Sequence, residues 1–189
     1  MGPPPRTAAP NPGVPDERAR VADERYVHPR HGICRVIGRQ ERKVGDGMRT
    51  YVELQVDASP SGRAALTMLL PEDELMEHVR DVAAEEVADA ALAAMNDKQP
   101  SDIEGASSWR ARVAKAETSL EVGDLVELAR VLRDFAVQDA DSGLSNSERR
   151  IADHIRDLVV GELVGAKEWT VEHAVEVVEE RLASASAAA

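Results

Sequence analysis

The sequence of 189 residues is poor in aromatic side chains, which make up 3% of it, and it contains a single cysteine. One cysteine excludes a disulfide within the chain and is typical of the reducing cytoplasm. No apolar run approaches the ~18 residues needed to span a membrane. The amino terminus also lacks the apolar core of a secretion signal. We therefore expect a soluble, cytoplasmic protein that does not bind a membrane.

The sequence also lacks the motifs of the common enzyme classes. It has no phosphate-binding loop, no nucleophile elbow and no HExxH motif. His28, His31 and Cys34 have a spacing that could suit a metal ion, but no further cluster of ligands accompanies them. Gly32, followed by a strand pattern, favours a structural turn there instead. We expect no enzyme activity, no catalytic residue, no cofactor and no metal site.

Negative charge is in excess, but it is unevenly distributed. The formal net charge is −12, with +3 in residues 1–70 and −15 in residues 71–189. This balance argues against free, non-specific binding to nucleic acid. Any DNA contact made by the second half of the chain must be local, and it must be supported by a protein partner.

The first 20 residues form a separate segment by composition. They contain six prolines and few apolar side chains. Such a composition cannot bury enough apolar surface to fold. We expect residues 1–20 to be a disordered leader.

The next segment has the short, β-rich runs of a small sheet. These runs are Ile33–Ile37, Tyr51–Val56 and Ala64–Leu70, and Gly45–Gly47 is a turn between the first two. Several short antiparallel strands in so few residues predict a strongly curved sheet. We expect residues 21–72 to form a β-barrel of the SH3 or Tudor type.

After Pro71 the apolar residues recur at helical spacing, so the fold class is α+β with two domains. The second domain, residues 73–183, is expected to be an all-helical bundle without any strand. An alanine-rich helix is expected between Pro71 and Asn96. Trp169 precedes Thr170, which can cap the last helix, and we expect this tryptophan to pack in the core. The tail, residues 184–189, should fray.

Residues 107–163 are predicted to form three helices joined by tight turns. Asp124 opens the middle helix as a capping residue, and Gly143 suits a left-handed turn at its end. Ser145 and Glu148 then form a second capping box. Short connections of this kind make consecutive helices antiparallel neighbours.

Trp109 is the most informative residue of the leading helix. Ser107 or Ser108 can cap this helix, which places Trp109 in the first turn. Because Trp109 shares a helical face with Leu120, one interpretation is that it completes a core stripe. A first-turn side chain can also overhang the end of its core. Arg110 and Arg112 flank Trp109, and Lys115 lies one turn on. An exposed indole surrounded by these cations is a plausible wedge or stacking surface for nucleic acid.

The strand region contains a basic cluster that permits two interpretations. Arg39, Arg42 and Arg49 are part of it. They can belong to a solvated strand face. Alternatively, they can form a docking surface for acidic residues of a partner.

The order of these motifs resembles the CarD (CdnL-like) family of bacterial transcription regulators. After Trp109 come VGDLVELARVLRDF, a Gly-Leu-Ser turn, ERR and VGEL, as in the helical domain of that family. Upstream, Val27-His-Pro-Arg-His-Gly32 is similar to the V-Y-P-x-H-G opening of the family's polymerase-interacting domain. The resemblance covers residues 21–183.

The resemblance implies that the barrel docks on the β subunit of RNA polymerase. Family members present arginines from two places on the barrel, and Arg42 occupies one matching position. The other position, two residues before Pro71, is Leu69 here. Leucine cannot replace a guanidinium's hydrogen bonds, so polymerase binding is weakened, moved onto Arg39 or Arg49, or lost.

The resemblance further implies that Trp109 inserts at the minor groove at the upstream edge of the melted promoter and stabilises the open complex. DNA contact would be weak and not sequence-specific, and the protein would associate with the nucleoid through polymerase. The alternative is a CarD-like protein–protein interaction module in which the polymerase and DNA contacts are weakened or lost. The expected DNA-contacting residues are Trp109, Arg110, Arg112, Lys115, Arg149 and Arg150.

Overall fold

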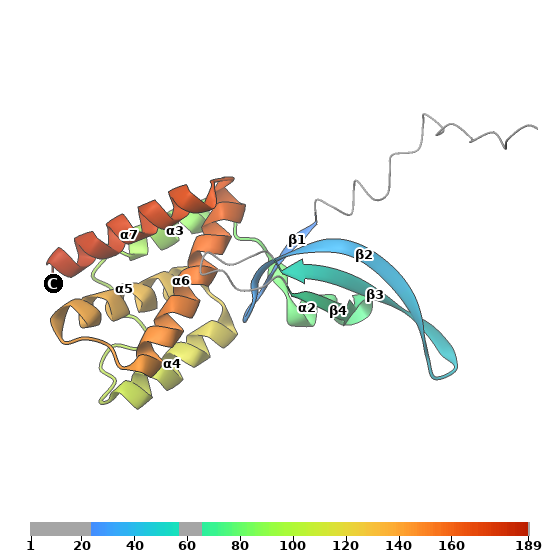
Figure 1. The fold of residues 1–189 in the computed structure, drawn as a ribbon, viewed down its shortest axis with the longest axis horizontal. Coiled ribbons are helices and arrows are strands. Elements are labelled where there is room, and N and C mark those ends of the chain that lie inside the picture. The colour runs from blue at the N-terminus through green and yellow to red at the C-terminus, as the bar shows by residue number, and fades with distance from the viewer. Residues whose placement is uncertain (1–23, 57–65, 189) are drawn as a thin grey trace, which may run out of the picture.

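The computed structural model describes residues 24–56 and 66–188 and shows an α+β protein (Figure 1). An antiparallel sheet forms the N-terminal part, and helices form the C-terminal part. The expected leader, residues 1–20, lies outside the described residues. No helix in the described ranges is both long enough and apolar enough to cross a membrane.

The sheet has five antiparallel strands in the order β4-β3-β2-β1-β5. β4 and β5 are its two edges and do not pair with each other, so the sheet is open and the expected barrel is not confirmed. The strands are β1 (Arg25–His28), β2 (Gly32–Val44), β3 (Gly47–Val56), β4 (Thr67–Pro71) and β5 (Arg80–Asp81).

The β2–β3 hairpin is longer than the sequence indicated, and it extends away from the helices (Figure 1). The turn predicted at Gly45–Gly47 is confirmed: Val44 pairs with Gly47, and Gly45 has a φ of +61°. A glycine at the first central position of a two-residue turn matches the twist of the two strands. A β-bulge between Val36 and Gly38 shifts the register of β2. Beyond the bulge, the side chains of β2 change faces.

One face of the sheet carries a small apolar core. Val36, Val52 and Leu54 point to this face and are almost completely buried. The short helix α2 (Leu75–His78) covers them with Leu75, which is also buried. The sheet therefore has a core of its own, separate from that of the helices.

The single long helix expected between Pro71 and Asn96 is wrong, and so is the expectation of no strand after Pro71. A 3-10 turn, η1 (Glu72–Glu74), and α2 come first. The chain is then extended at Val79, and β5 pairs with β1. Helical structure resumes only at α3 (Glu85–Ala94). Backbone pairing with β1 outweighs the local helix preference of this segment.

The three predicted capping residues are confirmed. Ser108 accepts a hydrogen bond from the Ala111 N–H, and Asp124 accepts one from the Glu127 N–H. Ser145 and Glu148 form a complete capping box. The helices that these residues open are α4 (Trp109–Val122), α5 (Leu125–Asp141) and α6 (Asn146–Lys167).

The helices pack around α5, which contacts α3, α6 and α7 (Val171–Ala188). Phe135 of α5 is 1% exposed at the centre of this core. Trp169 is half-buried against the same core, as expected, and the Thr170 hydroxyl caps α7 by accepting from the His173 N–H. α7 continues to Ala188, so residues 184–188 are helical rather than frayed.

Candidate nucleic-acid and partner interfaces

Trp109 is the first residue of α4, and 38% of its surface is exposed. Further along the helix, Ala116 and Leu120 are buried and Val113 packs against the core. The apolar stripe of α4 therefore packs in the core from Val113 onward, one turn after Trp109. Trp109 itself lies at the edge of the core. The Arg110 guanidinium carbon lies 4.5 Å from the centre of the indole ring. The two side chains form an exposed cation–π pair.

Arg112 has a different environment from Arg110. Its Nε donates to Glu148 at 2.7 Å, and the Glu148 side chain is only 2% exposed. Glu148 also accepts from the Ser145 N–H at 2.9 Å and from its hydroxyl at 2.7 Å. Burial raises the pKa of Glu148, but these hydrogen bonds outweigh it, so the pKa is lowered overall. Arg112 thus links α4 to α6 inside the bundle instead of facing outward.

The remaining basic residues expected to contact DNA point in separate directions. Lys115 donates to the Glu104 carbonyl at 3.4 Å, in the loop that precedes α4. Arg149 pairs with Asp139 of α5 at 3.2 Å. Arg150 lines a groove on the other side of α6. The structure therefore brings only Arg110 directly to Trp109.

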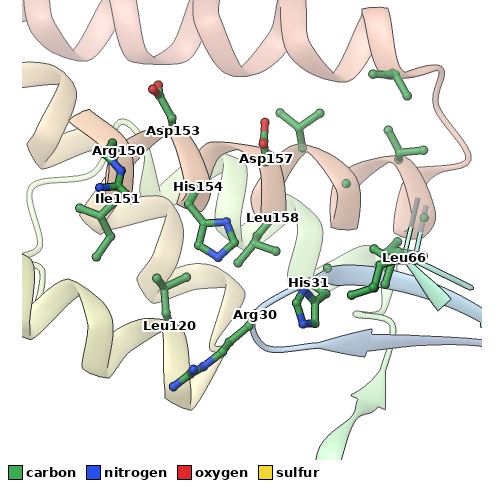
Figure 2. Close-up of a pocket in the computed structure, with 18 of the residues that line it drawn as sticks. Arg30, His31, Leu66, Leu120, Arg150, Ile151, Asp153, His154, Asp157 and Leu158 are labelled. Carbon is green, nitrogen blue, oxygen red and sulfur yellow. The ribbon is translucent and has the colours of Figure 1, made fainter. Parts of the chain in front are cut away.

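The groove beside Arg150 lies between the sheet and the helices and has a volume of about 1290 Å³. Figure 2 shows His154 and Leu158 of α6 on one wall and Arg30 and His31 of the β1–β2 turn on the other. Leu120 near the end of α4 closes one side (Figure 2). The groove runs along the contact between the two parts of the protein.

Arg42 lies on the face of the sheet opposite to its core. It pairs with Arg49 across the hairpin, and its guanidinium is 5.8 Å from the ring of Tyr51 on the same face. Leu69 is opposite Glu53 and also belongs to this face, because residues two apart on a strand point the same way. We call Arg42, Tyr51 and Leu69 the outer face.

Arg39 and Arg49 are held by neighbouring carboxylates. Arg39 pairs with Val52 and so lies on the core side, where it donates to Glu24 at 2.7 Å and to Glu72 at 2.8 Å. Arg49 shares the face of Arg42, but it donates to Asp73 and Glu74. The predicted basic cluster is therefore divided between two faces. Among Arg39, Arg42 and Arg49, only Arg42 makes no ion pair with the described residues.

The comparison with protein families identifies the helical part. The family model for the CarD C-terminal domain matches residues 90–179, from within α3 to within α7. The helical region is a CarD C-terminal domain. The resemblance to the CarD family found in the sequence is thus confirmed over these residues.

Sequence reasoning missed one group that joins the CarD C-terminal domain to the sheet. Arg80 of β5 donates to both carboxylate oxygens of Glu162 on α6, at 2.5 and 2.8 Å, and to the Gly123 carbonyl at 2.7 Å. Glu162 is 3% exposed and also accepts from the Ala83 N–H. A carboxylate on the apolar side of α6 was a possible signal, because such a buried group needs a partner.

Proposed function

We propose that this CarD-like protein regulates transcription by holding the β subunit of RNA polymerase with its sheet and promoter DNA with its helical domain. The outer face of the sheet makes the polymerase contact. Trp109 makes the DNA contact at the upstream edge of the melted region, where it hinders closing of the bubble. A contact made only in the open state shifts the equilibrium by its differential affinity.

The observation that carries this proposal is the position of Trp109. A large aromatic side chain at the start of a helix is 38% exposed, at the end of the apolar stripe of its own helix, and is paired with a guanidinium. The indole offers an apolar surface that can stack on or unstack a base step, and Arg110 adds positive charge beside it. This pair suits a small, non-sequence-specific contact with DNA.

The charge of the helical domain requires that this contact be assisted. Residues 71–189 have a net charge of −15, which repels free DNA at long range. Attachment to polymerase replaces a bimolecular encounter with a local one at high effective concentration. A weak contact by Trp109 and Arg110 is then sufficient.

The arrangement of the outer face supports a polymerase contact by Arg42. Its guanidinium is free of internal ion pairs among the described residues, whereas Arg39 and Arg49 already neutralise acidic side chains of this chain. An exposed arginine beside a tyrosine is a common composition of interface centres. Tyr51 and Leu69 supply the apolar surface around it.

The test is the lifetime of promoter open complexes formed by polymerase with and without the protein. A competitor that traps free polymerase is added to preformed open complexes. The proposal predicts that these complexes are lost more slowly when the protein is present. Salt-dependent binding of the protein to promoter DNA alone should be undetectable or very weak. Equal lifetimes in the two reactions would reject the DNA role.

Leu69 favours a second candidate function. A leucine at this position removes one of the two arginines that the family resemblance implies, and it leaves an apolar side chain on the outer face. The protein would then be an interaction module whose partner has a less acidic surface. Retention of polymerase by the full chain separates the two functions, because an interaction module of this kind does not retain it.

A further inference from the structure

The sheet and the helical domain are in direct contact, through β2 and α6. Ile33 of β2 is 7% exposed, yet it belongs to neither of the two apolar cores. It packs instead against α6, where the helix carries Gly165. A Cβ atom at Gly165 would lie 2.5 Å from Ile33 Cδ1 and 3.2 Å from Val82 Cγ1. α6 approaches β2 this closely because residue 165 has no side chain.

The same junction contains the Arg80–Glu162 pair. Arg80 belongs to the sheet through β5, and Glu162 lies less than one turn before Gly165 on α6. The guanidinium of Arg80 donates to both carboxylate oxygens of Glu162 and also to the Gly123 carbonyl. A buried pair with this geometry is costly to separate. We call Arg80, Glu162, Gly165 and Ile33 the joint.

The joint is hydrogen-bonded to the end of α4, the helix that begins with Trp109. Gly123, whose carbonyl accepts from Arg80, ends α4, and Trp109 begins it. The helix is about 20 Å long, so a rotation of about 10° at the joint would move its far end by about 3.5 Å. At that far end, Arg112 and Glu148 fix α4 to α6. The last turn of α4 is therefore tied to the sheet through Arg80, and its first turn is tied to α6 through Glu148.

We propose that the joint consists of positioning residues that set the location of Trp109 relative to the outer face of the sheet. This rests on the proposed function, in which polymerase holds one of these surfaces and DNA the other. The residues of the joint touch neither partner. They keep the distance between the outer face and Trp109 fixed. When the outer face binds polymerase, the indole therefore reaches one position on the DNA.

The first variant adds a side chain at the joint, and a second substitution then makes room for it by shortening the facing residue. Gly165→Val adds carbon atoms where Ile33 packs, and Ile33→Ala removes as many. The double variant Gly165→Val/Ile33→Ala therefore conserves volume. Gly161→Val is the matched control, because it makes the same change on the same helix at a site where a Cβ meets no atom within 4 Å.

Two measurements are made on the full chain. The first is the distance between spin labels at Lys43→Cys on the hairpin and Ser107→Cys beside Trp109, in a Cys34→Ser background. The second is open-complex lifetime, with polymerase affinity measured in parallel. We expect Gly165→Val to broaden or shift the distance distribution and to lose most of the lifetime gain at unchanged polymerase affinity. The control and the double variant should behave like the unmodified protein.

A Gly165→Val protein with an unchanged distance distribution would overturn the proposal, as would a changed distribution with an undiminished lifetime. If Gly165→Val does not fold, Arg80→Lys replaces it. Lysine keeps the charge but cannot bridge Glu162 and Gly123 with a planar fork, and the same two results are expected. If the unmodified protein itself leaves lifetime unaffected, the proposed function fails, whereas the label distance still reports whether the joint is rigid.

Discussion

The Nε atom of Arg112 lies 2.7 Å from the Oε1 atom of Glu148, and this buried pair ties the helix that carries Trp109 to the start of α6. Arg110, two residues earlier, faces the indole instead. Two arginines of one helical turn therefore have separate tasks. Arg112 fixes α4 to α6, whereas Arg110 belongs to the exposed surface around Trp109.

This difference predicts that the same substitution destabilises the protein to very different extents at the two positions. Arg112→Met leaves the Glu148 carboxylate buried without its cation and should lower the free energy of unfolding by about 3 kcal/mol. Arg110→Met, the matched control, removes only an exposed cation–π contact and should cost less than about 1 kcal/mol. Urea denaturation of both variants measures the two values. Equal losses would show that Arg112 is not a structural residue.

Arg42→Glu is predicted to weaken binding to RNA polymerase without changing the stability of the protein. The side chain is exposed on the outer face, so its loss removes no buried contact, whereas reversing its charge repels an acidic partner surface. Lys43→Glu is the control, since it makes the same change one residue along, on the opposite face of the strand. Retention on immobilised polymerase measures both. If the two variants bind equally well, polymerase does not use the outer face.

His28 gives the stability a component that depends on pH. Burial, followed by the neighbouring His31, His78 and Arg30, lowers the pKa of His28 from 6.5 to about 4. The folded state thus binds fewer protons than the unfolded state between these values, and this component of the stability is lost as pH falls from 6.5 towards 4.

His28→Asn should remove that component. Asparagine can still accept the hydrogen bond that His28 Nδ1 receives from the Arg30 N–H, but it does not titrate in this range. Unfolding free energies measured at pH 8 and pH 5 should differ less for the variant than for the unmodified protein. The same decline in both proteins would assign the pH dependence to other groups.

The parts of the fold that depend on neighbouring residues could be predicted from the sequence. The caps at Ser108, Asp124 and Ser145 are local hydrogen bonds, and their signals lie within four residues. β5 could not be predicted in this way. Its two residues have no strand pattern of their own and are extended because they pair with β1, more than fifty residues earlier.

In the candidate site, too, features set by neighbouring residues could be predicted, whereas features set by distant residues could not. The first-turn position of Trp109 follows from its cap, and its predicted partial exposure is confirmed, whereas its role in binding DNA stays a prediction. The role of Arg112 depends on a residue of another helix. The assignment of Arg42 to the outer face depends on the bulge between Val36 and Gly38, because strict alternation from the buried Val36 would place Arg42 on the core face.

The most direct test of the account is the effect of Trp109→Ala on open-complex lifetime. Val122→Ala, an exposed apolar residue at the other end of α4, is the control. Because Trp109 is 38% exposed whereas Phe135 is 1% exposed, its loss should move the melting temperature far less than Phe135→Ala, which should cost about 3–5 kcal/mol. The account predicts a nearly unchanged melting temperature, normal retention on polymerase and a shortened open-complex lifetime. A stable Trp109→Ala protein that prolongs the open complex as well as the unmodified protein does would contradict it.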